Sequence, residues 1–200
     1  MPKKITAIVG TYRKGHIIDS AVTELLHAAQ EQGAETNKIY LLDKNIEFCD
    51  NCRRCTQKIH SIRGVCVYDD DMSRILDEID KSDCIILASP INCFTITAIM
   101  KRFVERMMPY GYWPWGMLIP RFRVKLKTKK AVLITSSGCP EFLGRILFSS
   151  SFKILKAAAS SVGAKVIKKI YIGSIAISPD QTLPDKYRKR AYTAGRALLN

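Results

Sequence analysis

Hydrophobic residues form two kinds of pattern along this chain. Short runs of consecutive or alternating apolar residues, rich in β-branched side chains, are typical of strands. Between and after these runs, apolar residues recur every three or four positions, which is the spacing of one helical face. Three aspartates precede Met72, and Gly33 follows the first helical series, so these positions favour a helix start and a helix end. The predicted strands are 4–10, 37–42, 84–88, 131–135 and 165–172, and the predicted helices cover 18–29, 72–79, 96–107, 148–162 and 185–199.

Regular alternation of strands and helices predicts the α/β fold class. Residues 84–88 are continuously apolar, as in a strand that is covered on both faces of a parallel sheet. No internal repeat or linker is visible, so we expect a single domain over residues 1–200.

Two segments depart from this alternation: a cysteine-rich loop at 48–67 and an inserted aromatic loop at 109–128. The inserted loop contains both tryptophans of the chain, Trp113 and Trp115. It is open at this point whether this loop folds onto its own domain, contacts another subunit, or contacts a membrane surface.

Composition excludes several classes of protein. The apolar fraction is 47% and the charged fraction is 25%, which argues against a disordered chain. No stretch reaches the roughly 18 apolar residues of a spanning helix. The apolar run near the N-terminus is too short for the core of a signal peptide, so we expect a cytoplasmic protein without a membrane span.

Positive charge is concentrated in the second half of the chain. Residues 1–100 contain 12 Lys/Arg and 14 Asp/Glu, whereas residues 101–200 contain 20 and 4. Such asymmetry indicates either a solvated basic face or an anionic partner, such as a nucleic acid, a membrane surface or a phosphorylated small molecule. Basic and apolar residues alternate from position 121, but strands show this pattern for packing alone, so nucleic-acid binding is the least favoured of these.

Polar, flexible segments follow the first, third and fourth predicted strands. Ligands of open parallel sheets bind beyond the carboxyl ends of the strands. Residues 10–16 bring two glycines, a hydroxyl and cations to a helix start, where backbone N–H groups suit a phosphate. Together with 89–95 and 135–138, this loop outlines a nucleotide-like site.

Four of the seven cysteines are clustered. Cys49, Cys52, Cys55 and Cys66 have the spacing C-x₂-C-x₂-C-x₁₀-C. Thiolates at such intervals can ligate an iron–sulfur cluster or zinc, and reduced structural or redox-active thiols are the third alternative. Arg53 and Arg54 lie within the motif and favour the thiolate form.

These pieces, in this order, resemble the flavodoxin-like NAD(P)H-dependent FMN reductases, close to the iron–sulfur flavoproteins. The matching motifs run from residue 4 to about 108, and the strand pattern continues the resemblance to 199. The matching residues are Gly10-Thr11-Tyr12-Arg13-Lys14, the four clustered cysteines with Gly64 and Asp70-Asp71-Met72, Ser89-Pro90-Ile91, Lys101, Phe103 and Arg106.

The resemblance implies a doubly wound five-stranded parallel sheet of order 2-1-3-4-5 with bound FMN. It assigns three loops to the flavin. The implied phosphate loop contains Thr11, Arg13, Lys14, His16, Ile17 and Ile18; the ring loop contains Pro90, Ile91, Asn92, Cys93, Phe94 and Thr95; the third loop contains Thr135, Ser136, Ser137 and Gly138. The chain departs from the family pattern at Tyr12, Ile17 and Ile18, where small polar residues are usual, and at Asn92, where an aromatic residue is usual.

The implied function is transfer of hydride or electrons from NAD(P)H, through FMN, to a small acceptor such as a quinone or a flavin. No catalytic side chains are required, because the flavin carries the chemistry. The alternative is an iron–sulfur flavoprotein with a [4Fe-4S] cluster on Cys49, Cys52, Cys55 and Cys66, which passes electrons to a redox partner protein. A binder of nucleic acid or anionic surfaces is the distant alternative. The resemblance also implies a homo-oligomer.

Overall fold

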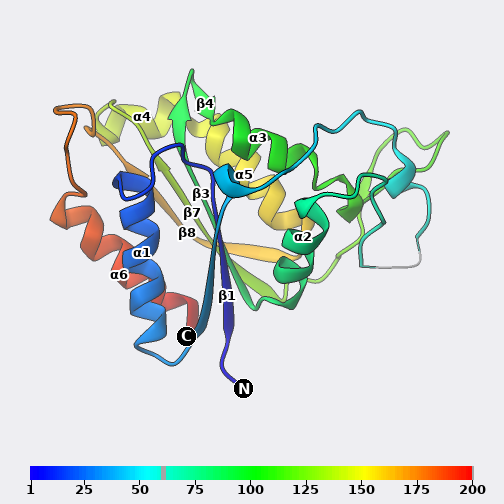
Figure 1. The fold of residues 1–200 in the computed structure, drawn as a ribbon, viewed down its shortest axis with the longest axis horizontal. Helices are drawn as coiled ribbons and strands as arrows, with labels where there is room; N and C mark the ends of the chain where they lie inside the picture. The colour runs from blue at the N-terminus through cyan, green and yellow to red at the C-terminus, as the bar shows by residue number, and fades with distance from the viewer. Residues whose placement is uncertain (60–61, 200) are drawn as a thin grey trace.

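A five-stranded parallel sheet forms the centre of the molecule (Figure 1). The computed structural model describes residues 1–59 and 62–199. The strands follow the order β2-β1-β3-β7-β8, and every neighbouring pair along this path is parallel. This is the predicted order 2-1-3-4-5, which is confirmed. The strands are β1 (Lys4–Val9), β2 (Glu35–Tyr40), β3 (Cys84–Asn92), β7 (Lys129–Ser136) and β8 (Ala164–Ile172).

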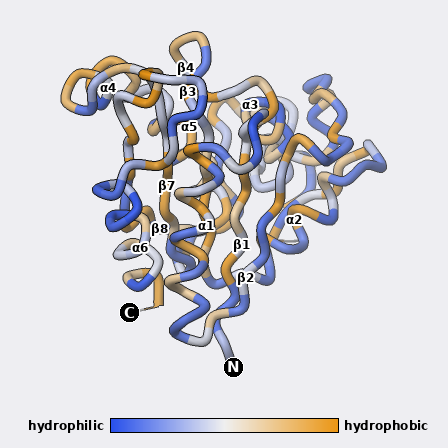
Figure 2. The backbone as a smooth tube through the Cα atoms, turned by 60° about the vertical axis from the view of Figure 1, so that its left-hand side comes forward, coloured by the Kyte–Doolittle hydropathy of each residue, from blue (hydrophilic) through white to orange (hydrophobic). Residues whose placement is uncertain are grey.

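Helices cover both faces of the sheet. One face packs against α1 (Ile17–Gln30) and α6 (Asp185–Leu199), and the other packs against α2 (Asp71–Lys81), α3 (Ala98–Glu105) and α5 (Ser149–Ser161) (Figure 1). Successive strand residues supply opposite cores, so Ile8 joins one and Val9 the other. The central strands are therefore hydrophobic along much of their length (Figure 2). In the part of the chain that the structure describes, no helix is sufficiently long and apolar to cross a membrane.

Local sequence signals explain where the helices begin and end. Asp70 is the N-cap of α2 and accepts a hydrogen bond from the Met72 amide at 3.0 Å. Gly33 follows α1 with a φ of +83°, a conformation that glycine adopts without a steric penalty. Thr97 caps α3 by accepting from the Met100 amide at 3.3 Å.

The sequence pattern did not predict the short elements. The third helix was predicted to begin at Ile96, but Thr95 and Ile96 turn back as β4 (Thr95–Ile96) and pair with the end of β3. Elements of two to seven residues are too short to show a hydrophobic period. The others are η1 (Leu41–Asp43), η2 (Arg54–Thr56), η3 (Met108–Tyr110), β5 (Gly111–Tyr112), β6 (Arg121–Phe122) and α4 (Glu141–Leu147).

The inserted loop 109–128 and the cysteine-rich loop 48–67 pack together beside the sheet (Figure 1). The Gly64 amide donates to the Pro109 carbonyl at 2.7 Å, and the Trp113 amide donates to the Thr56 carbonyl at 3.0 Å. Buried Tyr110 donates its hydroxyl to Asp80 at 2.7 Å. The inserted loop thus folds onto its own domain. Residues 60 and 61 of the cysteine-rich loop lie outside the described residues.

Part of the excess positive charge lies on the last strand of the sheet. Lys165, Lys168 and Lys169 are exposed on β8, which pairs only with β7 among the described strands. Exposed lysines on an edge strand oppose pairing with another chain. These three residues therefore have a structural role that needs no anionic partner.

Candidate functional site

A pocket of about 260 Å³ lies at the carboxyl edge of the sheet. The carboxyl ends of β1, β3, β7 and β8, and the loops that follow them, form its walls. Three of these loops are the segments that the sequence singled out. The predicted residues that line the pocket are Thr11, Arg13, His16, Ile17, Ile18, Pro90, Ile91, Asn92, Ser136, Ser137 and Gly138.

Five predicted residues lie outside this lining: Lys14, Cys93, Phe94, Thr95 and Thr135. The Lys14 ammonium is 2.6 Å from the Asp43 carboxylate, on the outer side of the loop. Phe94 is 78% exposed at the turn between β3 and β4, where it and Cys93 have positive φ values. Thr95 pairs with Asn92 across that turn, and Thr135 is buried within β7.

The fourth wall was absent from the sequence prediction. Its residues follow β8, whose carboxyl end reaches the same edge of the sheet as the other three strands. The sequence predicts this fifth strand, so the position of the residues directly after it was the signal that could have identified the fourth wall. The additional lining residues are Tyr12, Ile175, Ala176, Ser178, Pro179 and Gln181.

The start of α1 leaves backbone donors available to a ligand. The side chain of its N-cap residue, His16, makes no capping hydrogen bond. His16 therefore does not use the N–H groups of the first turn, at the positive end of the helix. Arg13 lies at the same end of the pocket and donates to the Pro179 carbonyl at 3.2 Å. Its guanidinium is also 3.3 Å from the His16 ring nitrogen. Arg13 thereby joins the first loop to the last loop.

Asp19 fixes the shape of the first loop from beneath. Its carboxylate is 5% exposed and accepts from the Gly15 amide at 2.6 Å and the Tyr40 hydroxyl at 2.8 Å. An ion pair with Lys38 completes the arrangement. Burial raises the pKa of Asp19, but the hydrogen bonds from Gly15, Lys38 and Tyr40 outweigh burial and hold the pKa below its usual value. The carboxylate therefore stays charged and holds Gly15 at its φ of +77°.

The third loop provides an unsatisfied polar atom. Ser136 is buried, and its hydroxyl has no hydrogen-bond partner in the structure. Gly138 approaches the loop after β8 so closely that a Cβ would lie 2.9 Å from the Ala176 side chain. Backbone donors, one cation and a free hydroxyl around an open pocket form a donor set that fits the phosphate and ring polar atoms of FMN.

The four clustered cysteines surround a second, smaller cavity. Cys49, Cys52, Cys55 and Cys66 all line it, and all four are free thiols. Burial and the three neighbouring thiols raise the pKa of Cys55 to about 11. Gly64 packs directly on this loop, where a Cβ would lie 1.8 Å from the Cys55 carbonyl oxygen.

Arg106 supplies positive charge to the cysteine cavity. Its guanidinium forms two hydrogen bonds with Asp70, at 2.6 and 3.1 Å, and a third with the Cys66 sulfur at 3.5 Å. Among the described residues, no group of three or more His, Cys, Asp or Glu side chains is arranged to hold a metal ion. The four thiols thus face a shared space without converging on one point.

Comparison with known proteins identifies the family. The family model described as NADPH-dependent FMN reductase matches residues 3–170. An iron-sulfur flavoprotein of Archaeoglobus fulgidus is 36% identical over 115 residues, covering 56% of this chain and 48% of that protein. An iron-sulfur flavoprotein of Methanosarcina thermophila is 28% identical over 135 residues, covering 68% and 63%. The chain spans about half to two thirds of the length of these curated relatives.

Solved structures agree on the fold. An NAD(P)H:quinone oxidoreductase from Methanothermobacter marburgensis superposes with a TM-score of 0.72 at 18% identity, covering 100% of this chain and 98% of that one. An FMN-dependent NADH-azoreductase from Bacillus anthracis, in complex with FMN, gives 0.71 at 16% identity and covers 100% of both chains. The family match extends from β1 into β8 and includes three of the loops that form the pocket. This chain belongs to the NADPH-dependent FMN reductase family.

Proposed function

We propose that the chain binds FMN in the pocket at the carboxyl edge of the sheet and uses it to pass electrons from NAD(P)H to a small acceptor. The convergence of four loops on the uncapped start of α1 is the observation that carries this proposal. FMN supplies the redox chemistry when bound, because its ring exchanges hydride and electrons.

The residues of the pocket have separate tasks in this proposal. Arg13 and the first turn of α1 bind the phosphate, because a cation and free N–H groups meet there. Pro90, Ile91 and Asn92 form the wall beside the ring. The Ser136 hydroxyl, which has no partner in the structure, donates to a polar atom of the ligand.

Adjacent cations in the first loop provide a matched test. Arg13 lines the pocket, whereas Lys14 pairs with Asp43 outside it. In fluorescence titrations, we expect Arg13→Gln to weaken FMN binding roughly 10- to 100-fold. This factor corresponds to about 1.5–3 kcal/mol, the contribution of one hydrogen bond to a charged group. Lys14→Gln should bind FMN as the wild type does.

Riboflavin, which lacks the phosphate, separates this effect from a general loss of structure. Arg13→Gln should leave riboflavin affinity unchanged. Equal weakening of FMN binding by both substitutions, or no FMN binding by the wild type, would contradict the proposed site. Anaerobic bleaching of bound flavin by NADH or NADPH then identifies the electron donor.

A second function is carried by the cysteine cavity: we propose that Cys49, Cys52, Cys55 and Cys66 hold a [4Fe-4S] cluster. A structural zinc site requires four ligands at about 2.0–2.3 Å from one ion. The thiols of the described residues are not arranged around a single ion, although all four face one cavity. Four thiols that face one cavity, with the Arg106 guanidinium beside Cys66, are a ligand set that suits an anionic iron–sulfur cluster.

Reconstitution with iron and sulfide tests the cluster. The wild type should bind about four irons per chain, the content of a four-cysteine cubane cluster. Cys66→Ser removes one ligand and should lower the iron content. Cys93 is exposed at the β3–β4 turn, outside the cavity, so Cys93→Ser should leave the iron content unchanged. The same iron content in both variants would exclude the cavity as the site of the cluster. One zinc per chain in the purified protein, with no iron, would contradict the proposed cluster and indicate a zinc site.

We also propose that a second copy of the chain covers the rim of the flavin pocket. Large apolar side chains are exposed around the carboxyl edge of the sheet, and α4 appears as a hydrophobic segment there (Figure 2). Such an exposed apolar patch is typical of an interaction surface. The exposed residues are Phe94 in the β3–β4 turn, Phe142 and Ile146 on α4, and Ile177 after β8.

A further inference from the structure

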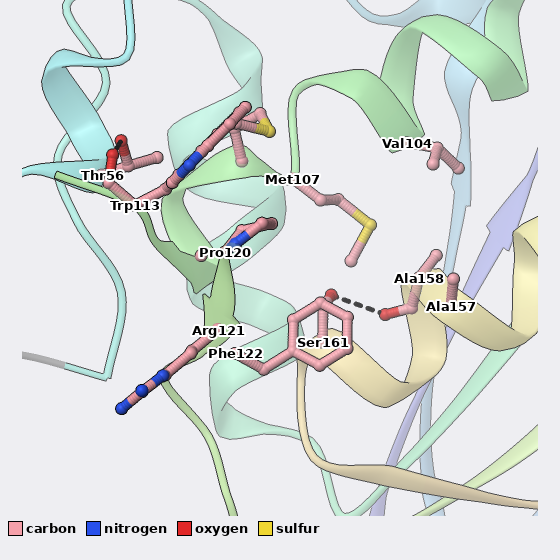
Figure 3. A pocket seen from close by; sticks show the side chains of 12 residues that line it. Thr56, Val104, Met107, Trp113, Pro120, Arg121, Phe122, Ala157, Ala158 and Ser161 are labelled. Atoms are coloured by element: carbon pink, nitrogen blue, oxygen red, sulfur yellow. Dashed lines mark hydrogen bonds between the residues drawn. The ribbon is translucent and has the colours of Figure 1, made fainter. Parts of the chain in front are cut away.

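A third cavity, of about 310 Å³, lies between the inserted loop and α5 (Figure 3). The segment at the end of α3, the inserted loop and α5 each contribute to its wall, together with Thr56 from the cysteine-rich loop. It shares no lining residue with the flavin pocket. The apolar part of the wall consists of Val104, Met107, Met108, Trp113, Pro120, Phe122, Ala157 and Ala158.

The polar groups of this cavity are already satisfied. The Ser161 hydroxyl donates to the Ala158 carbonyl at 2.8 Å, which Figure 3 shows as a dashed line. The Thr56 hydroxyl donates to the Arg53 carbonyl at 2.8 Å. The side chain of Arg121 extends away from the cavity (Figure 3). A charged or strongly polar occupant would therefore lose its hydration without compensation, so the cavity selects an uncharged, apolar molecule.

Volume and wall shape narrow the class of occupant. An apolar cavity of roughly 150 Å³ holds a single benzene ring. About twice that volume matches two fused rings, at the lower end of the roughly 300–1,000 Å³ of small-molecule pockets. Trp113 and Phe122 contribute aromatic faces on the side of the inserted loop, against which a planar ring system packs.

The aromatic wall is held in place before any occupant arrives. The Arg53 guanidinium lies 3.7 Å from the ring centroid of Trp113 and 4.3 Å from that of Trp115. Arg53 also donates to the Trp113 carbonyl at 2.7 Å. On the other strand of the small hairpin, Arg123 donates to the Gly111 carbonyl at 2.9 Å. A preformed wall of this kind reduces the entropic cost of binding.

The cavity also adjoins the cysteines. Met108 lines both this cavity and the cysteine cavity, and Thr56 directly follows Cys55. We propose that this cavity is a binding site for a small, uncharged bicyclic aromatic molecule, next to the cysteine cavity and separate from the flavin pocket. Next to the cysteine cavity, a redox-active bicyclic aromatic molecule is preferred. This preference for a redox-active molecule rests on the proposed function, whereas the proposed binding does not.

Intrinsic fluorescence provides a direct test, because both tryptophans of the chain lie in the inserted loop. The probe is 2-methyl-1,4-naphthoquinone, titrated into the FMN-saturated full-length chain. We expect saturable quenching in the wild type. Ala157 is exposed on α5 and lines the cavity, so Ala157→Phe fills the space and should weaken binding at least about tenfold, which is 1.4 kcal/mol.

Lys156→Phe is the matched control, because it places the same ring on an exposed, neighbouring position of α5 that does not line the cavity. It should bind the probe as the wild type does. Phe122→Ala removes a half-exposed wall residue and should also weaken binding, so the proposal does not depend on one variant.

Three outcomes would overturn the proposal. They are non-saturable quenching in the wild type, equal affinity in Ala157→Phe and Lys156→Phe, and dissociation of an oligomer by Ala157→Phe in sedimentation. The last result would make the cavity an interface between copies. FMN affinity, measured on the same samples, should be unchanged in all three variants, so failure of this proposal is distinguishable from failure of the flavin site.

Discussion

The guanidinium of Arg106 donates a hydrogen bond to the sulfur of Cys66 at 3.5 Å from a position that is almost fully buried. Arg106 is 2% exposed, and Asp70 neutralises it through two hydrogen bonds. Burial lowers the pKa of Arg106, but the hydrogen bonds that it donates to Asp70 and the proximity of Cys66 outweigh burial and raise that pKa. A guanidinium that stays protonated, with its charge compensated by Asp70, therefore donates a hydrogen bond to a cysteine of the cavity.

Removal of Arg106 should destabilise the chain strongly. Arg106→Met leaves Asp70 buried and unpaired, which costs about 3–5 kcal/mol. Lys101→Met, at an exposed position of the same helix, should change the free energy of unfolding by less than about 1 kcal/mol. Urea denaturation measures both. Similar losses in the two variants would show that the buried ion pair is not what stabilises this part of the fold.

Gly64 should be required for assembly of the cysteine cavity. In Gly64→Ala the new Cβ would lie 1.8 Å from the Cys55 carbonyl oxygen, so the loop must move. We expect lower iron content after reconstitution, and an FMN affinity equal to that of the wild type when both are measured without iron. Gly116→Ala is the control, since a Cβ at Gly116 would have no atom within 4 Å. Full iron content in Gly64→Ala would contradict this account of the loop.

The ionised carboxylate of Asp19 should make the free energy of unfolding depend on pH in the acidic range. Its pKa is lower in the folded chain than the ordinary value of 3.8, so its stabilising effect is fully present above pH 3.8 and is lost as the pH falls through the folded value. Asp19→Asn should therefore be less stable than the wild type by about 1.5–3 kcal/mol at neutral pH. The difference should shrink below about pH 4. Denaturant titrations at several pH values measure it, and a constant difference would argue against an ionised Asp19.

Phe142 tests the proposed contact between two copies. Phe142→Asp introduces a charge into the exposed apolar rim, which opposes burial against a second chain. We expect a shift toward the monomer in sedimentation velocity, with an unchanged circular dichroism spectrum. Leu118→Asp, at an even more exposed apolar position in the inserted loop, is the comparison. A shift toward the monomer in Leu118→Asp but not in Phe142→Asp would place the contact on the inserted loop.

Long, periodic segments predicted the alternation of strands and helices, and the ends of those strands located three walls of the pocket. The strand order came from the resemblance to the reductase family. Residues 84–88 are apolar at every position, and β3 occupies them. The predicted ring loop ran to Thr95, but only Pro90, Ile91 and Asn92 line the pocket. The turn through Cys93 and Phe94 uses positive φ values that neither residue type signals. Pro179 and Gln181 were missed because their segment has no motif, only a position after the last strand.

The pairing of Arg106 with Asp70 and Cys66 was beyond the sequence for a different reason. It joins residues 36 and 40 positions apart through side chains alone. The helix that ends just before Arg106 was recognised, but its spacing shows which face is apolar and not which buried cation has a partner. The apolar cavity beside the inserted loop was equally hidden, because its wall draws on separate parts of the chain.

Helix α3 connects the two redox sites that we propose. At its start, the Thr97 hydroxyl donates to the Gly10 carbonyl at 2.6 Å, under the flavin pocket; just past its end, Arg106 reaches the cysteines. At a rise of 1.5 Å per residue, these anchors are separated by about 14 Å of stiff backbone. We expect a ligand that displaces one anchor to displace the other through this backbone, which would link occupancy at the two ends. FMN affinity and iron affinity should each depend on the other, by the same factor in both directions.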